Sequence, residues 1–248
     1  MSFFARLATF YDELFPYNPQ TLDFIHTYFL SNRAMDLADV GCGTGQYAIE
    51  LANRGHTVVG IDLDAEMVKK AQCQAAQHSD RPIRFLTGDM RQLSSLISTV
   101  QGIYCIGNTM ANLTDKHDIV NTLKEFYDAT APGGSLLLQL VNFDRYIYQG
   151  TLHLPVIQRS PNGPRLIRTY LPSSNGLVEF HMELSIFNAS NEIIETYSAS
   201  TILYPITQAF LESQLIKVGF TNLDFRGGFD QSTFQVNSPA MVAIATRT

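Results

Sequence analysis

The sequence is poor in charged residues and has no long apolar run, and each shortage excludes a class of protein. Only 16% of its 248 residues are charged, 11% are aromatic and the mean hydropathy is near zero, which excludes an intrinsically disordered chain. The 16 glycines follow no period, which excludes a collagen-like chain. No window approaches about 18 consecutive apolar residues, so we expect no membrane span. What remains is a globular chain long enough for one large domain or two small ones.

Cysteine is also scarce. Cys42, Cys73 and Cys105 are odd in number, lie more than thirty residues apart and form no C-x-x-C motif. This pattern excludes a disulfide scaffold and predicts reduced thiols in a cytoplasmic protein. The six histidines share no short metal-binding spacing with the cysteines, so we expect no metal site. Residues 1–13 carry three charges and no small-residue cleavage site, which predicts an amphipathic helix rather than a signal peptide.

Positive charge is in the minority. The chain has 17 Lys and Arg residues against 23 Asp and Glu residues, for a net charge of −6. Proteins that bind nucleic acid generally carry a basic excess, so we expect no nucleic-acid partner. The acidic balance is compatible with a small cationic or neutral ligand.

Short apolar runs alternate with helix-period segments up to about residue 141. Apolar runs of about four to eight residues, separated by helical segments of about ten to fifteen, are typical of βαβ units. They predict a doubly wound α/β fold whose parallel sheet is covered on both faces. The expected strands are 34–39, 57–61, 83–86, 100–106 and 135–141.

Beyond Asn142 the pattern becomes β-rich. Between residues 151 and 204 four prolines interrupt the β-rich runs, and apolar side chains alternate strictly with polar ones from Val178 to Ile186. Strict alternation is typical of a half-buried antiparallel strand, so an antiparallel β insertion is expected here. The closing elements are a helix at 207–218 that ends at Gly219, and strands at 221–225 and 240–245.

A glycine-rich loop stands between the first expected strand and the helix after it, and reads Asp39-Val40-Gly41-Cys42-Gly43-Thr44-Gly45. Glycines let the backbone turn sharply and let a ligand lie against a helix N-terminus. Gln46 stands where a dinucleotide fingerprint needs glycine, and the spacing is not that of a nucleoside triphosphate loop. The loop therefore predicts a ligand site of another kind; the alternative is a tight turn without a ligand.

Two acidic residues follow the next strands. Asp62 ends the second strand, 21 residues beyond Gly41, where a carboxylate can accept both hydroxyls of a ribose. The alternative for Asp62 is a helix N-cap, but Asp64 is placed to fill that role. Asp89 follows the third strand, where its carboxylate can accept from an adenine amine while the backbone of Met90 donates to the ring. A helix N-cap at Asp89 is compatible with that role.

These motifs together resemble class I S-adenosylmethionine-dependent methyltransferases. The glycine loop, the strand ending at Asp62, Gly88-Asp89-Met90 and the Pro-Gly-Gly before the fifth strand occur in the family's order and span residues 34–141. The resemblance implies a Rossmann-like sheet of about seven strands with the last one antiparallel. It also implies S-adenosylmethionine as the cofactor, S-adenosylhomocysteine as its product, and a set of cofactor-binding residues. That set is Tyr11, Asp39, Gly41, Cys42, Gly43, Gly45, Asp62, Leu63, Asp89, Met90, Ile106 and Asn108.

A narrower resemblance points to the small-molecule branch around glycine and sarcosine N-methyltransferases. Residues 106–113 and Asn142-Phe143-Asp144 are similar to segments of those enzymes, and the β insertion is similar to their substrate lid. They place an arginine just before that asparagine, where this chain has Val141, so glycine is disfavoured unless Arg145 or Arg168 supplies the charge. Residues 105–108 also lack the Asp/Asn-Pro-Pro-Tyr motif of enzymes that methylate bases in DNA or RNA. The substrate-binding residues implied are Asn142, Tyr146, Arg168, Tyr204 and Phe229.

The resemblance implies a single domain over 1–248. Its parts are a cofactor-binding core at 18–141, a lid at 151–204 and a closing helix and strands at 205–248. Methyl transfer from a sulfonium needs alignment more than a catalytic dyad, and the residues that can accept a proton or hydrogen bond are Asn108, Tyr146, His181 and Tyr204. Two alternatives remain, a nicotinamide-dependent oxidoreductase and a regulatory module that binds the cofactor without turnover.

Overall fold

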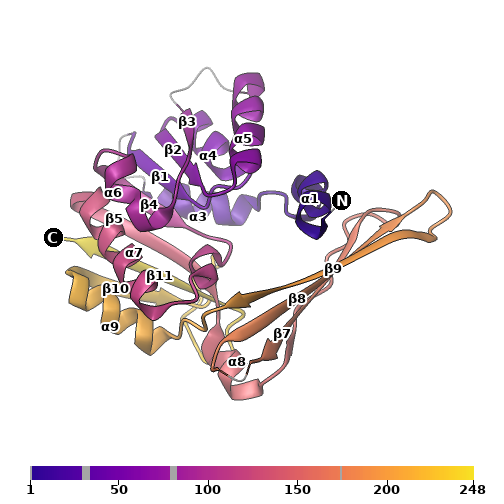
Figure 1. Ribbon diagram of the computed structural model, residues 1–248. Helices are drawn as coiled ribbons and strands as arrows, with labels where there is room; N and C mark the ends of the chain where they lie inside the picture. The colour runs from indigo at the N-terminus through magenta and orange to yellow at the C-terminus, as the bar shows by residue number, and fades with distance from the viewer. Residues whose placement is uncertain (1, 30–33, 79–82, 174) are drawn as a thin grey trace. The chain divides into compact units, whose positions relative to one another are not determined.

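The chain folds as two units in a computed structural model that describes residues 2–29, 34–78, 83–173 and 175–248 (Figure 1). Residues 17–145 and 206–248 form the larger unit, and residues 1–16 and 146–205 form the smaller one. The β insertion and the N-terminal segment therefore belong to the same unit, although more than a hundred residues separate them in the sequence.

The larger unit is built on a seven-stranded sheet with the strand order β10-β11-β5-β4-β1-β2-β3. Strands β1 to β5 run parallel, and β11 lies antiparallel between β5 and β10. The expected doubly wound α/β fold with an antiparallel last strand is confirmed. The strands are β1 (Asp36–Val40), β2 (Thr57–Asp62), β3 (Ile83–Thr87), β4 (Val100–Cys105), β5 (Thr130–Val141), β10 (Phe220–Arg226) and β11 (Ala240–Arg247).

Helices cover both faces of this sheet (Figure 1). Its core includes Leu22, Ile25 and Phe29 of α3, which are almost fully buried and pack in one cluster with strand residues such as Leu37. Burial of one such side chain contributes about 1.5–3 kcal/mol. The helical segments are α3 (Pro19–Phe29), α4 (Gln46–Asn53), α5 (Ala65–His78), η1 (Met90–Gln92), α6 (Leu93–Leu96), η2 (Thr109–Asn112), α7 (Lys116–Ala129), α8 (Phe143–Gln149) and α9 (Gln208–Val218).

The ends of these elements follow the capping residues in the sequence. The Asp64 carboxylate accepts from the backbone of Glu66 at the start of α5, as the sequence predicts. Helix α9 ends at Gly219, which adopts φ +110°. Strand β5 begins at Thr130, earlier than expected, because the Pro-Gly-Gly segment joins the strand with an irregular register.

The smaller unit is a four-stranded antiparallel sheet with the order β6-β7-β8-β9. Its core cluster contains Phe3 and Leu14 from the N-terminal helices together with Leu166, Met182 and Leu184 from the sheet. The predicted antiparallel insertion is confirmed, and the N-terminal helices supply part of its core. The elements are α1 (Phe3–Thr9), α2 (Tyr11–Leu14), β6 (Leu152–His153), β7 (Arg165–Pro172), β8 (Val178–Phe187) and β9 (Ile193–Leu203).

None of the helices within the described ranges is long and apolar enough to cross a membrane.

Candidate functional site

The loop from Gly41 to Gly45 depends on glycine for two separate reasons. Gly41, Gly43 and Gly45 have φ values of +78°, +54° and +81°, a region in which side chains with a Cβ are strained. A Cβ on Gly41 would also lie 2.5 Å from Cγ2 of Thr109, and one on Gly45 would lie 2.6 Å from the ring of Phe85. The backbone therefore turns sharply after β1 and packs closely against its neighbours.

Asp62 holds this loop from the end of β2. Its Oδ2 accepts a hydrogen bond of 2.8 Å from the Gly43 amide, and its Oδ1 accepts one of 2.9 Å from the Asp64 amide. An ionised carboxylate has about four acceptor positions, so about two remain at Asp62 after these bonds. Asp62 thus joins the glycine loop to the β2–α5 turn and can still accept from a ligand.

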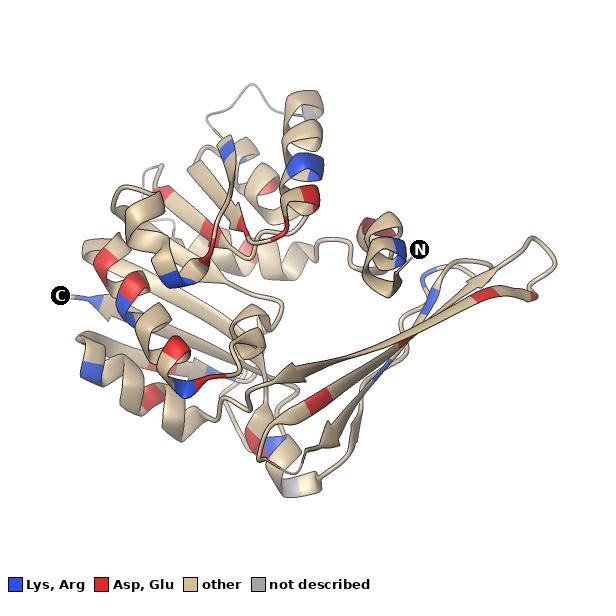
Figure 2. Ribbon diagram, in the orientation of Figure 1, with Lys and Arg blue, Asp and Glu red and all other residues tan. Residues whose placement is uncertain are grey.

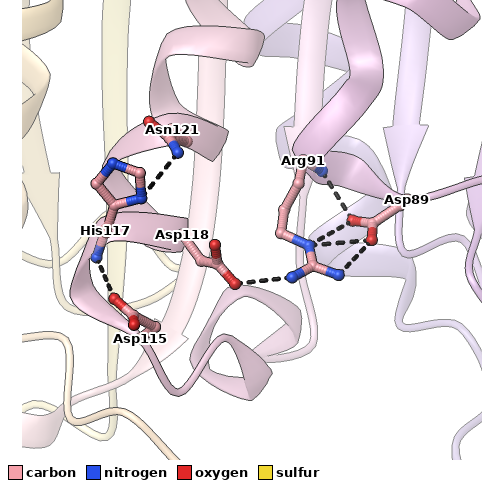
Figure 3. Close-up of polar contacts among 6 residues, drawn as sticks. All are labelled: Asp89, Arg91, Asp115, His117, Asp118 and Asn121. Atoms are coloured by element: carbon pink, nitrogen blue, oxygen red, sulfur yellow. Dashed lines mark hydrogen bonds and ion pairs between the residues drawn. The ribbon is translucent and has the colours of Figure 1, made fainter.

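Asp89 is held by Arg91, a residue that no local sequence motif marks. The Arg91 guanidinium donates to both carboxylate oxygens of Asp89, and its Nη1 lies 2.7 Å from Oδ2 of Asp118 on α7 (Figure 3). The Asp89 carboxylate also accepts from the Arg91 amide, which confirms the helix-cap geometry expected there. The guanidinium lowers the pKa of Asp89 below its ordinary value, so the side chain is a carboxylate at neutral pH.

The same helix carries a second polar group beside this network. The Asp115 carboxylate caps α7 by accepting from the His117 amide, and the His117 ring is 3.1 Å from Nδ2 of Asn121 (Figure 3). Asp115 and Asp118 lie in or next to the first turn of α7, where negative charge interacts favourably with the helix dipole.

Asp39 is a carboxyl group in a fully packed environment. It is 3% exposed at the end of β1, and burial raises its pKa from the ordinary value to about 8. The nearby Asp62 carboxylate acts in the same direction, while the Tyr104 hydroxyl acts against it. Asp39 is therefore protonated at pH 7.

Cys42 lies in the same loop and is half-buried. Burial raises the pKa of its thiol, and the neighbouring Asp62 acts in the same direction, so the thiolate that a nucleophile requires is not formed near neutral pH. Its place in the loop suits packing against a ligand rather than covalent chemistry.

Two hydrogen bonds connect the loop after β4 to β5. The Gly107 amide donates to the side-chain oxygen of Gln139 at 2.7 Å, and Oδ1 of Asn108 accepts from the Val141 amide at 3.0 Å. Asn108 adopts φ +67°, a left-handed conformation that asparagine tolerates better than most residues. Because its side-chain oxygen is already bonded, Asn108 has a positioning role in the fold.

The cofactor-site candidates of the larger unit follow the carboxyl ends of adjacent parallel strands. These ends meet at one edge of the sheet, where ligands bind in open α/β folds. Leu63 is 71% exposed after β2, Met90 opens η1 after β3, and Ile106 packs at the edge of the core after β4. Their contacts with a cofactor stay predictions, as does the role of Tyr11, which lies on α2 of the smaller unit against Phe15.

Two substrate candidates have contacts within the larger unit. Asn142 is 1% exposed, and its amide nitrogen lies within 3.1 Å of the carbonyl oxygens of Gln235, Val236 and Ser238. Phe229 packs edge-on against Phe24 of α3. These contacts hold the segment between β10 and β11, and a role in substrate binding stays a prediction for both residues.

The remaining candidates lie in the smaller unit. Tyr146 is buried and packs edge-on against Tyr170, and burial raises the pKa of its hydroxyl. Arg168 donates to the Pro155 carbonyl, and burial lowers the pKa of its guanidinium. His181 is within hydrogen-bond distance of Ser200, on the sheet face opposite the core residue Met182. Tyr204 follows β9 and is half-buried. Their roles in catalysis or substrate binding also stay predictions.

Comparison with known proteins identifies similar sequences. A family profile described as a methyltransferase domain matches residues 37–134. The putative methyltransferase YqeM of Bacillus subtilis is 34% identical over 140 residues, and the match covers 55% of each chain, so the chain spans about half the length of that relative. The glycine/sarcosine N-methyltransferase of Halorhodospira halochloris is 27% identical over 218 residues, which cover 88% of this chain and 76% of that protein.

Solved structures share the fold along the whole chain. An S-adenosylmethionine-dependent methyltransferase from Clostridium acetobutylicum superposes with a TM-score of 0.81 at 16% identity, over 98% of each chain. DesVI from Streptomyces venezuelae gives a TM-score of 0.75 at 16% identity over the full length of both chains. The smaller unit therefore has a counterpart in these proteins, as well as the larger one.

Proposed function

Because the chain is a class I S-adenosylmethionine-dependent methyltransferase, we propose that it methylates an amine nitrogen of a small molecule. S-Adenosylmethionine is its cofactor, and when bound it supplies a methyl group on a sulfonium, already activated for displacement. What the chain must provide is a binding site, alignment of the acceptor with the methyl group, and exclusion of water.

The main support for the cofactor site comes from the contacts of the Asp62 carboxylate. After its two bonds to backbone amides it has about two acceptor positions left, which is the number that the two hydroxyls of a ribose require. Gly41, Gly43 and Gly45 give the neighbouring loop the sharp backbone turn that a ligand-binding loop between a strand and a helix requires. The chemistry of these residues fits the cofactor. The Asp89 carboxylate is already engaged by the amide and guanidinium of Arg91, so the bond to the adenine amine that the family resemblance implies stays a prediction.

Two points support a small amine as the acceptor. Relatives that this chain matches over 73% and 76% of their length are glycine/sarcosine N-methyltransferases. The position at which those enzymes carry an arginine is Val141 here, whose backbone amide bonds to Asn108. An amine that presents no carboxylate at this position is therefore a better acceptor than glycine.

The catalytic contribution would come mainly from alignment. Holding a nucleophile in line with the methyl group contributes several kcal/mol without a dedicated base. The amine has to be neutral when it attacks, so a nearby acceptor would assist. Asn108 cannot take the proton, because an amide is not a base and its oxygen already accepts from Val141. Tyr146, Tyr204 and His181 remain the candidates.

The cofactor site is tested by replacing Asp62 with asparagine and measuring binding of S-adenosylhomocysteine by calorimetry. Hydrogen bonds to a charged group contribute about 1.5–3 kcal/mol, so the affinity should fall about 10- to 150-fold. Asp64→Asn is the matched control, since asparagine caps helices as well as aspartate does and the affinity should not change. Equal affinities in all three proteins would refute the ribose assignment.

The acceptor class is tested with a panel of amines, amino sugars, amino acids and carboxylic acids. The expected products are N-methylated amines, with glycine a poor acceptor, and mass spectrometry with fragmentation locates the methyl group. Products methylated only on oxygen would overturn the amine assignment. Cofactor binding without turnover on any acceptor would favour a regulatory module, and stabilisation by NAD alone would favour an oxidoreductase.

A further inference from the structure

Strand β9 is an edge strand whose only irregularity in the described ranges is a register shift at Ile194, near its N-terminal end. In the described ranges it pairs with β8 on one side and with no strand on the other. It is 11 residues long, contains neither proline nor lysine, and has one charged residue, Glu195. Ile193, Ile194 and Ile202 are 52%, 57% and 41% exposed. Long apolar edges of this kind pair readily with another strand.

The other three sheet edges in the described ranges are protected in familiar ways. Strand β6 has only two residues and β3 has five. Strand β10 contains a register shift between Thr221 and Asp224, and a surface ion pair joins Asp224 to Arg226. Short strands, irregularities and charges are common means of blocking edge pairing. Strand β9 also has a register shift, at Ile194, but from Glu195 to Leu203 it runs in regular register and contains neither proline nor lysine.

The sequence of β9 is close to a palindrome about Ser198. In an antiparallel arrangement of two such strands related by a two-fold axis at Ser198, Ile193 is opposite Leu203 and Ile194 is opposite Ile202. The remaining opposite positions are Glu195 with Thr201, Thr196 with Ser200, and Tyr197 with Ala199. Apolar side chains meet apolar ones, hydroxyls meet hydroxyls, and the large Tyr197 meets the small Ala199. Cross-strand pairs of these types stabilise a sheet by about 0.2–1 kcal/mol each.

One face of β9 is exposed to solvent along the strand. Ile194, Thr196, Ser198, Ser200 and Ile202 alternate along β9 and are all exposed, whereas the residues between them are half-buried. If the two-fold axis is moved from Ser198 to Tyr197, Ile194 lies opposite Ser200 instead of Ile202. The register centred at Ser198 therefore gives the better match between apolar side chains.

Charge does not oppose the pairing. The Glu195 carboxylate is 2.9 Å from the Arg6 guanidinium and accepts a hydrogen bond of 2.9 Å from the Tyr197 hydroxyl, all within the smaller unit. In the centred register the residue opposite Glu195 is Thr201, so the two acidic side chains do not face each other. The hairpin of β8 and β9 carries few other charged residues (Figure 2).

We propose that β9 is a homodimerisation strand, which pairs antiparallel with β9 of a second copy of this chain about a two-fold axis at Ser198. The pairing joins the two four-stranded sheets into one continuous sheet and satisfies the free backbone groups of both edges. It involves only the smaller unit and does not depend on the methyl acceptor.

The test is sedimentation velocity on the full chain with paired charge variants. Ser198→Lys and Ser198→Asp each place two like charges opposite each other at the axis, and both are expected to be monomers at concentrations where the wild type is a dimer. A 1:1 mixture of the two variants places lysine opposite aspartate and should restore the dimer. Ser190→Lys adds the same charge in the exposed turn of the same hairpin and should leave the dimer intact.

A monomeric wild type, a dimeric Ser198→Lys variant, or a mixture that stays monomeric would each overturn the proposal. Circular dichroism checks that the variants are folded. If the variants do not fold, the wild type alone still tests the proposal. Hydrogen exchange of residues 193–203 in the wild type should slow as the protein concentration is raised through the dimerisation range. Exchange that does not depend on concentration would also overturn the proposal.

Discussion

At the scale of single residues, Asp39 is a buried carboxyl group whose raised pKa makes the stability of the fold depend on pH. Its pKa is about 8 in the folded chain, against about 3.9 for an aspartate in water, because burial disfavours the charged form. Between these two values the folded chain holds a proton that the unfolded chain has lost. Raising the pH across this window therefore lowers the free energy of unfolding.

The pH effect is measurable by urea unfolding between pH 4 and 8 without cofactor. Loss of one proton changes the free energy of unfolding by at most about 1.4 kcal/mol per pH unit. Asp39→Asn removes this contribution, so its stability relative to the wild type should rise with pH across the window. Asp36→Asn, an exposed aspartate on the same strand, serves as the control and should follow the wild type. An Asp39→Asn variant that also follows the wild type would show that this carboxyl is ionised in the folded chain.

The two reasons for glycine in the 41–45 loop can be separated by comparing two alanine variants. Gly45 and Gly55 both have positive φ values, of +81° and +103°, but a Cβ meets the Phe85 ring only at position 45. Gly55→Ala should cost about 1–2 kcal/mol of unfolding free energy from backbone strain alone. Gly45→Ala should cost about 1–3 kcal/mol more because the core is overpacked. Equal losses in urea titrations of the two variants would mean that the Phe85 ring moves aside without cost.

At the scale of elements, Asn142 connects the end of β5 to the segment before β11. Its amide nitrogen lies near three carbonyl oxygens of residues 235–238, and its oxygen accepts from the Arg145 amide at the start of α8. One buried side chain thus satisfies backbone groups from two segments about ninety residues apart in the sequence. The resemblance to N-methyltransferases implied only that Asn142 contacts the substrate.

Replacing Asn142 should release the 235–238 segment. Asn142→Ala removes the donor to these carbonyl groups, which should cost about 0.5–1.5 kcal/mol, the net contribution of a typical hydrogen bond. Asn142→Asp keeps the shape but places a carboxylate oxygen against those carbonyls, so the loss should be larger. Hydrogen exchange should accelerate at 235–240 in both variants, with β1 and β4 unchanged. An aspartate variant as stable as the wild type would contradict this account.

The parallel strands of the larger unit were predictable, because they are short apolar runs, and the first three end at aspartate or are followed by glycine. Helices α3 and α8 were not assigned from the sequence. Helix α8 follows Asn142 directly, and its seven residues are too few to establish a helical period. Arg91, Gln139 and Thr109 were missed at the site for a different reason, since their partners lie on other elements and no local pattern marks them.

At the scale of the whole molecule, the division into units does not follow the order of the chain. The N-terminal helices pack with the β insertion, and Phe3 and Leu14 are part of its core. An amphipathic N-terminal helix was expected, but its apolar side chains are equally suited to either unit. The family resemblance implied a cofactor contact for Tyr11, and it gave no indication that Phe3 and Leu14 enter the core of the β insertion.

Two adjacent phenylalanines test this arrangement. Phe3 is 6% exposed and Phe4 is 51% exposed. Phe3→Ala should cost about 3–5 kcal/mol and accelerate hydrogen exchange in β7 and β8, while Phe4→Ala should cost less than about 1 kcal/mol. Faster exchange of β1 and β4 in place of β7 and β8 would mean that Phe3 packs with the larger unit.

The sequence by itself determined the parallel sheet, the antiparallel insertion, the glycine loop and the acids that follow successive strands. Each of these depends on local periodicity or on the conformational needs of single residues. Only the tertiary structure decided that Arg91 holds Asp89, that Asn142 joins two distant segments, that the N-terminus completes the core of the insertion and that β9 is left at an edge. Contacts between residues far apart in the chain depend on three-dimensional packing, and no local pattern encodes their partners.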